Sequence, residues 1–423
     1  MRLMDMDKQA LLDFKNEVDR QYAEMQKLNL KLDMSRGKPS AEQLELSMNM
    51  LNIPASELIR TENGMDTRNY GGIDGLPEIK KIFSELFDVE TENVFIGGNS
   101  SLALMYNAVA TCMAHGISGC KPWSAQKKVR FLCPVPGYDR HFAICEYFGI
   151  EMIPVEMNSD GPDMDRVEEY VNNDETIKGI WCVPMYSNPG GVTYSDETVR
   201  RFAALKPKAK DFRIFWDNAY CVHHLTDTPD KLLSLSKECG KNGNSDMILM
   251  FASTSKISFS GAGVAAMACF GDTMKDMKDA MSVHTIGYDK INQLRHVCFF
   301  KNADGIKQHM LKHKAIIAPK FGAVLKKLNE IKELDICSWS TPNGGYFVSF
   351  NGMDGCAKEI VRLCREAGVV LTSAGASFPY GKDPRDRNIR IAPTYPTVGE
   401  LETAMDLFCI CVKLASVNKL LGQ

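Results

Sequence analysis

Short apolar runs alternate with helical segments through the middle of the chain, from about residue 93 to residue 270. The runs have the length and the β-branched content of buried strands, and the segments between them have a helical spacing of apolar residues. The expected strands are NVFI (93–96), VRFLC (129–133), EMIPV (151–155), GIWCV (179–183), FRIFW (212–216), MILMF (247–251) and GVAAMACF (263–270). The expected helices lie near 101–114, 138–148, 163–173 and 195–205. This alternation predicts an α/β fold with a large, mostly parallel, seven-stranded sheet whose faces are covered.

The flanking segments have a different pattern, in which longer helices dominate. Apolar residues from Leu11 to Met25 recur every three to four positions and predict a helix over 8–29. GLPEIKKIFSELF (75–87) predicts a helix with Pro77 in its first turn. Beyond about residue 310 we expect helices at 311–334, 355–367 and 397–418, with short strands in GGYFVSF, VVLT and NIRIA.

The change of pattern predicts two domains. A large domain over residues 50–310 contains the sheet, and a smaller α+β domain combines residues 1–49 with 311–423. Ligands of open α/β sheets bind beyond the carboxyl ends of the strands, so functional residues are expected there.

Charge and cysteine content narrow the classes of partner. With 50 Lys and Arg against 53 Asp and Glu, the net charge of −3 lacks the basic excess of nucleic-acid-binding proteins. We expect no signal peptide, because MRLMDMDKQALL is charged throughout, and no membrane helix, because no apolar stretch approaches about 20 residues. The 14 cysteines form no CxxC pair, and several lie in apolar runs. They indicate reduced core thiols in a cytoplasmic protein and no metal site.

Polar residues follow four of the expected strands, and each group alone has an ordinary structural explanation. Asn99, Ser100 and Ser101 open a helix after VFIGG, an arrangement that binds phosphate or simply caps the helix. Asn188 in SNPGG belongs to an ordinary turn sequence. Asp217 directly follows FRIFW, where it acts as a cap or as a buried acid that needs a partner.

Lys256 lies shortly after MILMF, behind Ser253 and Ser255. A lysine at the end of a buried strand either forms an ion pair or loses its proton and attacks a carbonyl. Together, the four strand ends offer a phosphate cradle, an acid, a lysine and an amide donor. These are the groups that pyridoxal 5′-phosphate requires, since it has an aldehyde, a ring nitrogen, a phenolic oxygen and a phosphate.

Longer segments carry a resemblance to a known family. The chain is similar to fold-type I pyridoxal-phosphate aminotransferases of the aspartate aminotransferase superfamily, and in detail to the bacterial aspartate aminotransferases of type Ic. Asn188 precedes Asp217 by 29 residues, and Tyr220 and Lys256 follow Asp217 by 3 and 39 residues, spacings that match the family. The supporting segments are RNYGGIDGLPEIKKIF, GGNSS, PVPGYDRH, YSNPGGVTYS, WDNAY, STSKISFSGAGVA, YDKINQLRHV and NIRIAPTYP.

The resemblance implies a role for each residue. Lys256 would form the Schiff base and shuttle the proton, and Asp217 would pair with the pyridinium nitrogen. Tyr138 would stack on the ring, and Asn188 and Tyr220 would bind its phenolic oxygen, which makes Lys256, Asp217 and Tyr220 the expected catalytic residues. The phosphate would be held by Asn99, Ser100, Ser101, Ser253 and Ser255.

Further roles implied by the resemblance concern the partner subunit and the substrate. Tyr70 would reach the phosphate of the neighbouring subunit, which implies a homodimer. Arg390 would clamp the substrate α-carboxylate, with Asn188 and Gly37 also in contact with the substrate. Arg36 and Arg295 are candidates for the distal carboxylate of aspartate, although each is equally explained by a structural ion pair, and Arg140 and Arg68 are weaker candidates.

One segment departs from the common family pattern. Many relatives have Pro-Gly-Leu-Arg shortly after the lysine, and that arginine grips the phosphate, whereas this chain has Ser260-Gly261-Ala262-Gly263. The type Ic proteins look similar there, so the departure does not indicate a dead site. It leaves open which cation compensates the phosphate.

The predicted function is transamination from an amino acid, expected to be aspartate, to a 2-oxo acid such as 2-oxoglutarate. The alternatives are a lyase or decarboxylase on the same cofactor, because fold does not fix reaction, and a non-catalytic sensor. A sensor of this type usually carries an N-terminal DNA-binding helix pair, and only one amphipathic helix precedes SRGKP here. His223 and His224 are interpreted as packing residues, because no carboxylate or cysteine clusters with them.

Overall fold

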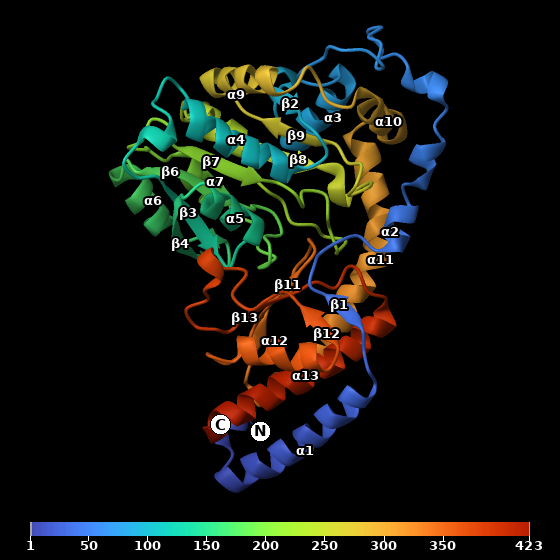
Figure 1. Ribbon diagram of the computed structural model, residues 1–423, viewed down its shortest axis with the longest axis vertical. Helices are drawn as coiled ribbons and strands as arrows, with labels where there is room; N and C mark the ends of the chain where they lie inside the picture. The colour runs from blue at the N-terminus through green and yellow to red at the C-terminus, as the bar shows by residue number, and fades with distance from the viewer. Residues whose placement is uncertain (1, 423) are drawn as a thin grey trace.

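The computed structural model describes residues 2–422, and one large sheet organises most of them (Figure 1). The sheet has eight strands in the order β2-β9-β8-β7-β6-β3-β4-β5. The central strands β8, β7, β6, β3 and β4 are mutually parallel, β9 is antiparallel to both of its neighbours, and β5 is antiparallel to β4. Their bounds are β2 (Val94–Ile96), β9 (Ala265–Ala268), β8 (Ile248–Ser253), β7 (Arg213–Asp217), β6 (Ile177–Cys182), β3 (Arg130–Val135), β4 (Glu151–Asn158) and β5 (Gly161–Pro162).

The predicted mostly parallel sheet is confirmed, and each of the seven predicted runs overlaps one of its strands. The eighth strand, β5, has only two residues and was not predicted, because two residues carry no periodic signal. Strands β6 and β7 are buried along their whole length, which explains why they read as continuous apolar runs.

Helices cover both faces of the sheet and form a separate hydrophobic core on each. One core includes residues of α3 (Pro77–Phe87), α6 (Met164–Asn173), α7 (Asp196–Ala203), α8 (Leu235–Lys241) and α10 (Lys290–Phe300). The other includes residues of α4 (Ser101–His115), α5 (Asp139–Tyr147) and α9 (Gly271–His284). Helices α9 and α10 were not predicted, although Met274, Met277 and Met281 have helical spacing and are buried against the sheet.

A third core joins the two ends of the chain, in the lower part of Figure 1. It is built by α1 (Lys8–Lys27), α11 (Ala303–Asn329), α12 (Ala357–Glu366) and α13 (Val398–Leu421), and α1 packs along α13. An antiparallel sheet of β10 (Ser338–Trp339), β11 (Val348–Asn351) and β13 (Asn388–Ile391) and the parallel pair of β1 (Leu32–Met34) with β12 (Val369–Leu371) complete this part. The short helix α2 (Ala41–Glu45) lies beside α11.

Helix α11 spans the predicted domain boundary at residue 310. It begins at Ala303, eight residues before the predicted start at 311, because the Asn302 side chain caps it by accepting a hydrogen bond from the Gly305 N–H at 2.8 Å. Ile306 and Met310 pack in a core of the large sheet, whereas Ile317 and Phe321 pack in the core formed by the chain ends. The two-domain division stays a prediction, and α11 belongs to both packing units.

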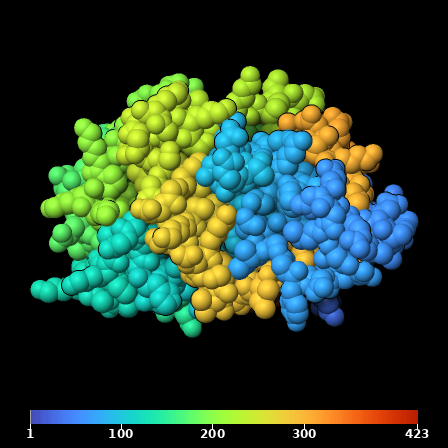
Figure 2. Space-filling model, turned by 90° about the horizontal axis from the view of Figure 1, so that it is seen from above, coloured from blue at the N-terminus to red at the C-terminus, as the bar shows by residue number. Residues whose placement is uncertain are grey.

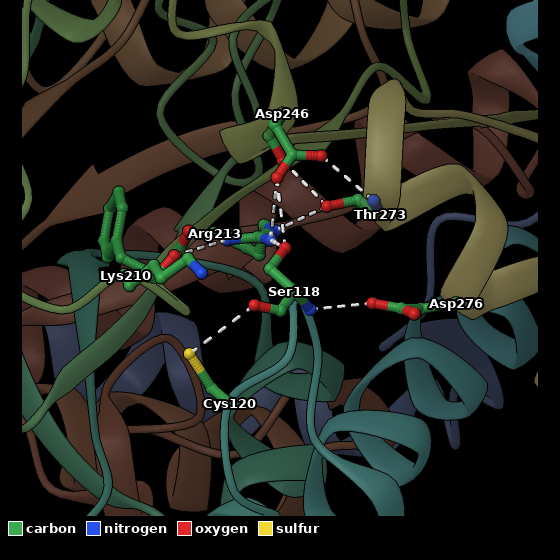
Figure 3. Close-up of polar contacts among 8 residues, drawn as sticks. Ser118, Cys120, Lys210, Arg213, Asp246, Thr273 and Asp276 are labelled. Carbon is green, nitrogen blue, oxygen red and sulfur yellow. Dashed lines mark hydrogen bonds and ion pairs between the residues drawn. The ribbon is translucent and has the colours of Figure 1, made fainter.

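A polar cluster around Arg213 ties strands and helices together at the start of β7 (Figure 3). The Arg213 guanidinium is buried and donates to the Thr273 hydroxyl at 3.0 Å, to the Phe212 carbonyl at 2.7 Å, and to the Ser118 hydroxyl. It also forms an ion pair with Asp246 at 3.3 Å. Because these partners come from the ends of β7, α9 and the segment after α4, the cluster fixes their relative positions.

No helix among residues 2–422 has the length and apolar character needed to cross a membrane.

Candidate active site

A cavity of about 570 Å³ lies at the carboxyl ends of the parallel strands. Asp217 ends β7, Ser253 ends β8, and Asn188 and Tyr138 follow β6 and β3. Because parallel strands end at the same sheet edge, residues far apart in the sequence meet there. The opposite wall consists of Arg390 in β13, Phe347 before β11, and the N-terminal segment Ser35–Pro39.

Asp217 lies deep in this cavity and is 2% exposed. Its Oδ2 lies 3.1 Å from Nε2 of His141, whose ring stacks on Trp181 at a centroid distance of 4.5 Å. Its Oδ1 is buried and has no hydrogen-bond partner among the described residues. A buried carboxylate oxygen without a donor is costly, so Oδ1 suits a cationic N–H group on a ligand in the cavity.

Sequence reasoning did not assign a role to His141. The segment PVPGYDRH contained a signal for it, because Tyr138 occupies the N-cap position of α5 and His141 follows one turn later on the same side of that helix. Tyr138 and His141 have their ring centroids 4.9 Å apart. Tyr138 therefore lines the cavity, while His141, outside the cavity lining, contacts Asp217.

Lys256 enters the cavity from a short 3-10 helix that directly follows β8. Its Nζ lies 5.1 Å from the centre of the Tyr220 ring and 5.9 Å from the centre of the Tyr346 ring. Desolvation by these surroundings lowers the pKa of Lys256, Asp217 opposes the shift, and Arg390 adds to it. The lowered pKa favours the unprotonated amine relative to a lysine in water.

Buried side chains hold the backbone around Lys256. His223 Nε2 lies 3.3 Å from the Lys256 carbonyl oxygen, and the Tyr346 hydroxyl donates to the same oxygen at 3.5 Å. His296 Nε2 lies 3.0 Å from the Thr254 hydroxyl and 2.8 Å from the Ser258 hydroxyl. Burial lowers the pKa of His223 to about 3, so this imidazole is neutral at pH 7 and its Nε2–H donates to the carbonyl.

Tyr138, Tyr220 and Asn188 line the cavity around Asp217 and Lys256. Desolvation raises the pKa of Tyr138 to about 12 and that of Tyr220 well above its usual value. Both phenols therefore keep their protons at pH 7 and can donate hydrogen bonds. Asn188 is buried, and its Oδ1 accepts a hydrogen bond from Arg390 Nη1 at 3.3 Å.

Hydroxyl groups gather around the N-terminus of α4. Ser100, Ser101, Ser253 and Ser255 line the cavity, whereas Asn99 does not, and its carbonyl oxygen accepts a hydrogen bond from the Ser255 hydroxyl at 3.1 Å. The free N–H groups of the first helical turn, together with these hydroxyls, suit an anion such as phosphate. Ser260, from the segment that lacks the family's arginine, also lines the cavity.

Arg390 forms the far end of the site and is 6% exposed. Its Nη1 donates to Asp139 Oδ1 at 2.8 Å, and its guanidinium carbon lies 4.9 Å from the centre of the Phe347 ring. Its Nε is buried and has no partner among residues 2–422. Apart from the family resemblance, no local pattern distinguishes Arg390 from an exposed strand arginine, and its burial in β13 provides the difference.

The remaining predicted site residues divide into those that line the cavity and those that lie outside it. Arg36 and Gly37 line the cavity, and a Cβ on Gly37 would lie 2.5 Å from the Phe347 ring, so only glycine fits there without rearrangement. Tyr70 is 82% exposed and lies outside the cavity of its own chain. Arg295 is also absent from the cavity wall, and its Nε is buried without a partner among the described residues.

The cavity's chemistry fits pyridoxal phosphate. A free buried carboxylate oxygen, a lysine with a lowered pKa, protonated phenols and a hydroxyl-lined helix terminus correspond to the groups of that cofactor. Within residues 2–422 there is no group of three or more His, Cys, Asp or Glu side chains arranged to hold a metal ion.

Comparison with known proteins agrees with this chemistry. The sequence profile of the family described as "Aspartate amino-transferase" matches residues 6–423. A protein of Mycolicibacterium smegmatis, named as a candidate aminotransferase, is 49% identical over 96% of this chain and 95% of its own length. An aspartate aminotransferase of Corynebacterium glutamicum is 42% identical over 98% of this chain and 96% of its own length.

A solved structure has the same overall fold. The crystal structure of an aspartate transaminase from Corynebacterium glutamicum superposes with a TM-score of 0.96, at 42% identity, over 99% of both chains. Fold and site thus define an aminotransferase of fold type I. The chain belongs to the aspartate aminotransferase family, which confirms the resemblance seen in its sequence.

Proposed function

We propose that this enzyme transfers the amino group of aspartate to a 2-oxo acid such as 2-oxoglutarate, with pyridoxal 5′-phosphate held in the cavity. The observation that carries the proposal is the pairing of Asp217, with its free buried Oδ1, and Lys256, with its lowered pKa, in one cavity that also contains the buried Arg390. Aspartate as the donor is taken from the similarity to aspartate aminotransferases.

Each wall of the cavity would hold one part of the cofactor. In this proposal Asp217 Oδ1 would accept a hydrogen bond from the protonated ring nitrogen and keep it protonated, and Asn188 and Tyr220 would bind the phenolic oxygen. Tyr138 stacks against the ring, and the phosphate lies at the N-terminus of α4 among Ser100, Ser101, Ser253 and Ser255. When bound, the cofactor supplies an aldehyde that takes up the amino group and a ring that withdraws electrons from the substrate.

Lys256 would move the proton on which transamination depends. Its Nζ would remove the proton from the substrate Cα, which requires an unprotonated amine, and would then deliver that proton to the aldehyde carbon of the cofactor. Burial favours that form, and Asp217 opposes it. The neutral His223 holds the Lys256 carbonyl without adding a second positive charge next to the amine.

Two cationic regions would receive the two carboxylates of aspartate. Arg390 is proposed for the α-carboxylate, because a planar guanidinium binds a carboxylate through two parallel hydrogen bonds. Arg36 and Arg140 both line the cavity. They are the candidates to bind the distal carboxylate of a substrate held in the cavity of their own subunit. Arg295 lies outside this wall and is a candidate only for a site shared between subunits.

We further propose a cytoplasmic homodimer. Tyr70, Val283 and Ile286 are strongly exposed. Tyr70 belongs to the blue segment and Val283 and Ile286 belong to the gold segment, and these two segments lie side by side in the view from above (Figure 2). A second copy on this face would cover these apolar side chains and bring Tyr70 to the partner's phosphate site. Many of the cysteines are buried and all are unpaired, which suits a reducing compartment.

Half-transamination with aspartate tests the proposed reaction. The reconstituted enzyme, mixed with aspartate and no 2-oxo acid, should release one oxaloacetate per site and shift the cofactor absorbance to that of the amine form. Pyruvate with ammonia would indicate a lyase, and a yellow protein that changes with no amino acid would indicate a sensor. Lys256→Ala is the control, and it should release no oxaloacetate and show no absorbance of the amine form.

A further inference from the structure

The ion pair between Arg390 and Asp139 joins two unequal partners. The Asp139 carboxylate contacts Arg390 Nη1 at 2.8 Å, and both residues line the cavity. The Arg390 side chain is 6% exposed, whereas that of Asp139 is 34% exposed. The pair therefore links a cation fixed in the protein to a carboxylate that already contacts solvent.

Each partner is placed by a different part of the fold. Arg390 lies in β13, where Ser349 of β11 is its partner in the sheet register, and its guanidinium lies over the Phe347 ring. Asp139 is the first residue of α5, which spans nine residues. The positive end of that helix stabilises a carboxylate there even when it is not paired with Arg390. Of the two, Asp139 is the side chain that can turn away.

A carboxylate ligand would compete with Asp139. A bidentate ligand needs two N–H groups of Arg390. Nη1 is already engaged by Asp139 and by Asn188, and Nε is unpartnered. A ligand that takes Nη1 must displace the Asp139 carboxylate, and one that uses the other nitrogens must lie next to that negative charge. In both cases Asp139 weakens binding.

We propose that Asp139 is a positioning residue that serves as an internal carboxylate for Arg390 and is exchanged for the carboxylate of the substrate. This inference rests on the proposed function, in which Arg390 binds the substrate. With the cavity free of substrate, Asp139 neutralises a guanidinium that would otherwise be buried without a counter-ion. The exchange keeps Arg390 paired in both states and lowers the affinity for carboxylate substrates.

Binding of succinate to the cofactor-loaded enzyme tests the exchange, because succinate has two carboxylates and no amino group to transfer. We expect Asp139→Asn to bind succinate about three- to tenfold more tightly than wild type, the effect of losing one partly exposed ion pair. Asp139→Ser should show the same change, and the KM for aspartate should fall in parallel. Damage to the fold would not tighten binding, so this gain separates the proposed role from a structural one.

Thermal unfolding gives a second readout that does not depend on activity. Without succinate, Asp139→Asn should melt below wild type, because Arg390 has lost its partner, and saturating succinate should narrow the gap. The matched control is Asp165→Asn, which removes a first-turn aspartate of α6 that pairs with Arg201 at 2.6 Å outside the cavity. This control should bind succinate as wild type does.

The outcomes separate this inference from the function on which it rests. If wild type binds succinate and Arg390→Gln does not, Arg390 has its proposed role. Equal or weaker succinate binding by both Asp139 variants would then overturn the exchange. If Arg390→Gln binds succinate as well as wild type does, the proposed function of Arg390 fails and the exchange fails with it.

Discussion

At the residue scale, the two oxygens of Asp217 have different surroundings. Oδ2 contacts His141, and Oδ1 is buried without a partner among residues 2–422. Trp181 stacks on His141 and keeps that imidazole in place. The carboxylate is therefore oriented from one side and available on the other, as the proposed pairing with a cationic ring requires.

Replacing Asp217 should remove this charge without emptying the site. We expect Asp217→Ala to lower turnover with aspartate by about 10²–10³-fold, the size of effect seen when one preorganised electrostatic group is lost. Steady-state rates measure the loss, and the cofactor absorbance checks that the cofactor is still bound. Wild-type turnover in a variant that retains the cofactor would contradict the role proposed for Asp217.

At the scale of elements, β7 has a polar anchor at each end. Arg213 begins the strand in the cluster of Figure 3, and Asp217 ends it in the cavity. The residues between them are fully buried and give the strand no freedom to shift relative to β6 and β8. The position of Asp217 thus depends on packing and on hydrogen bonds made at the opposite end of the same strand.

Removing the anchor at the start of β7 should destabilise the enzyme. We expect Arg213→Met to lower the free energy of unfolding by about 2–4 kcal/mol, because several buried hydrogen bonds are lost while Asp246 keeps access to solvent. Urea denaturation measures this change. Arg166→Met is the control, since Arg166 pairs with Glu169 on the surface and its loss should cost below about 0.5 kcal/mol. Similar losses in both variants would refute the role of the cluster.

At the scale of the whole molecule, buried histidines make stability depend on pH. Burial lowers the pKa of His223 to about 3 and the pKa values of His296 and His313 to about 4, against about 6.5 in an unfolded chain. Between these values the unfolded chain binds protons that the folded protein does not. Their contribution to stability is therefore complete above about pH 6.5 and is lost progressively as the pH falls towards 4.

This linkage predicts the effect of removing one histidine. Each neutral histidine contributes up to about 1.4 kcal/mol per pH unit to the slope of stability below pH 6.5. We expect His296→Gln to reduce the slope between pH 6 and pH 5 by about that amount, as measured by urea unfolding at several pH values. His115→Gln, at an exposed position on α4, should leave the slope unchanged. An unaltered slope in His296→Gln would show that another group controls the acid response.

The sequence by itself determined the features that depend on local pattern. Alternating apolar runs and helical segments defined the seven main strands, and the polar residues at their ends identified Asp217 and Lys256, because the ends of parallel strands converge. Segments such as STSKISFSGAGVA and NIRIAPTYP also indicated the family, because the order and spacing of such motifs can be read directly from the sequence.

Only the tertiary structure decided which polar groups meet and which stay unpaired. Asp139 and Arg390 are 251 residues apart, and no local pattern indicates that they form an ion pair. The contact of His141 with Asp217 and the position of Arg295 outside the cavity likewise arise from the packing of separate elements. Burial sets the cost of an unpaired charge, and burial is a property of the folded chain, so the sequence could propose the chemical groups but not their partners.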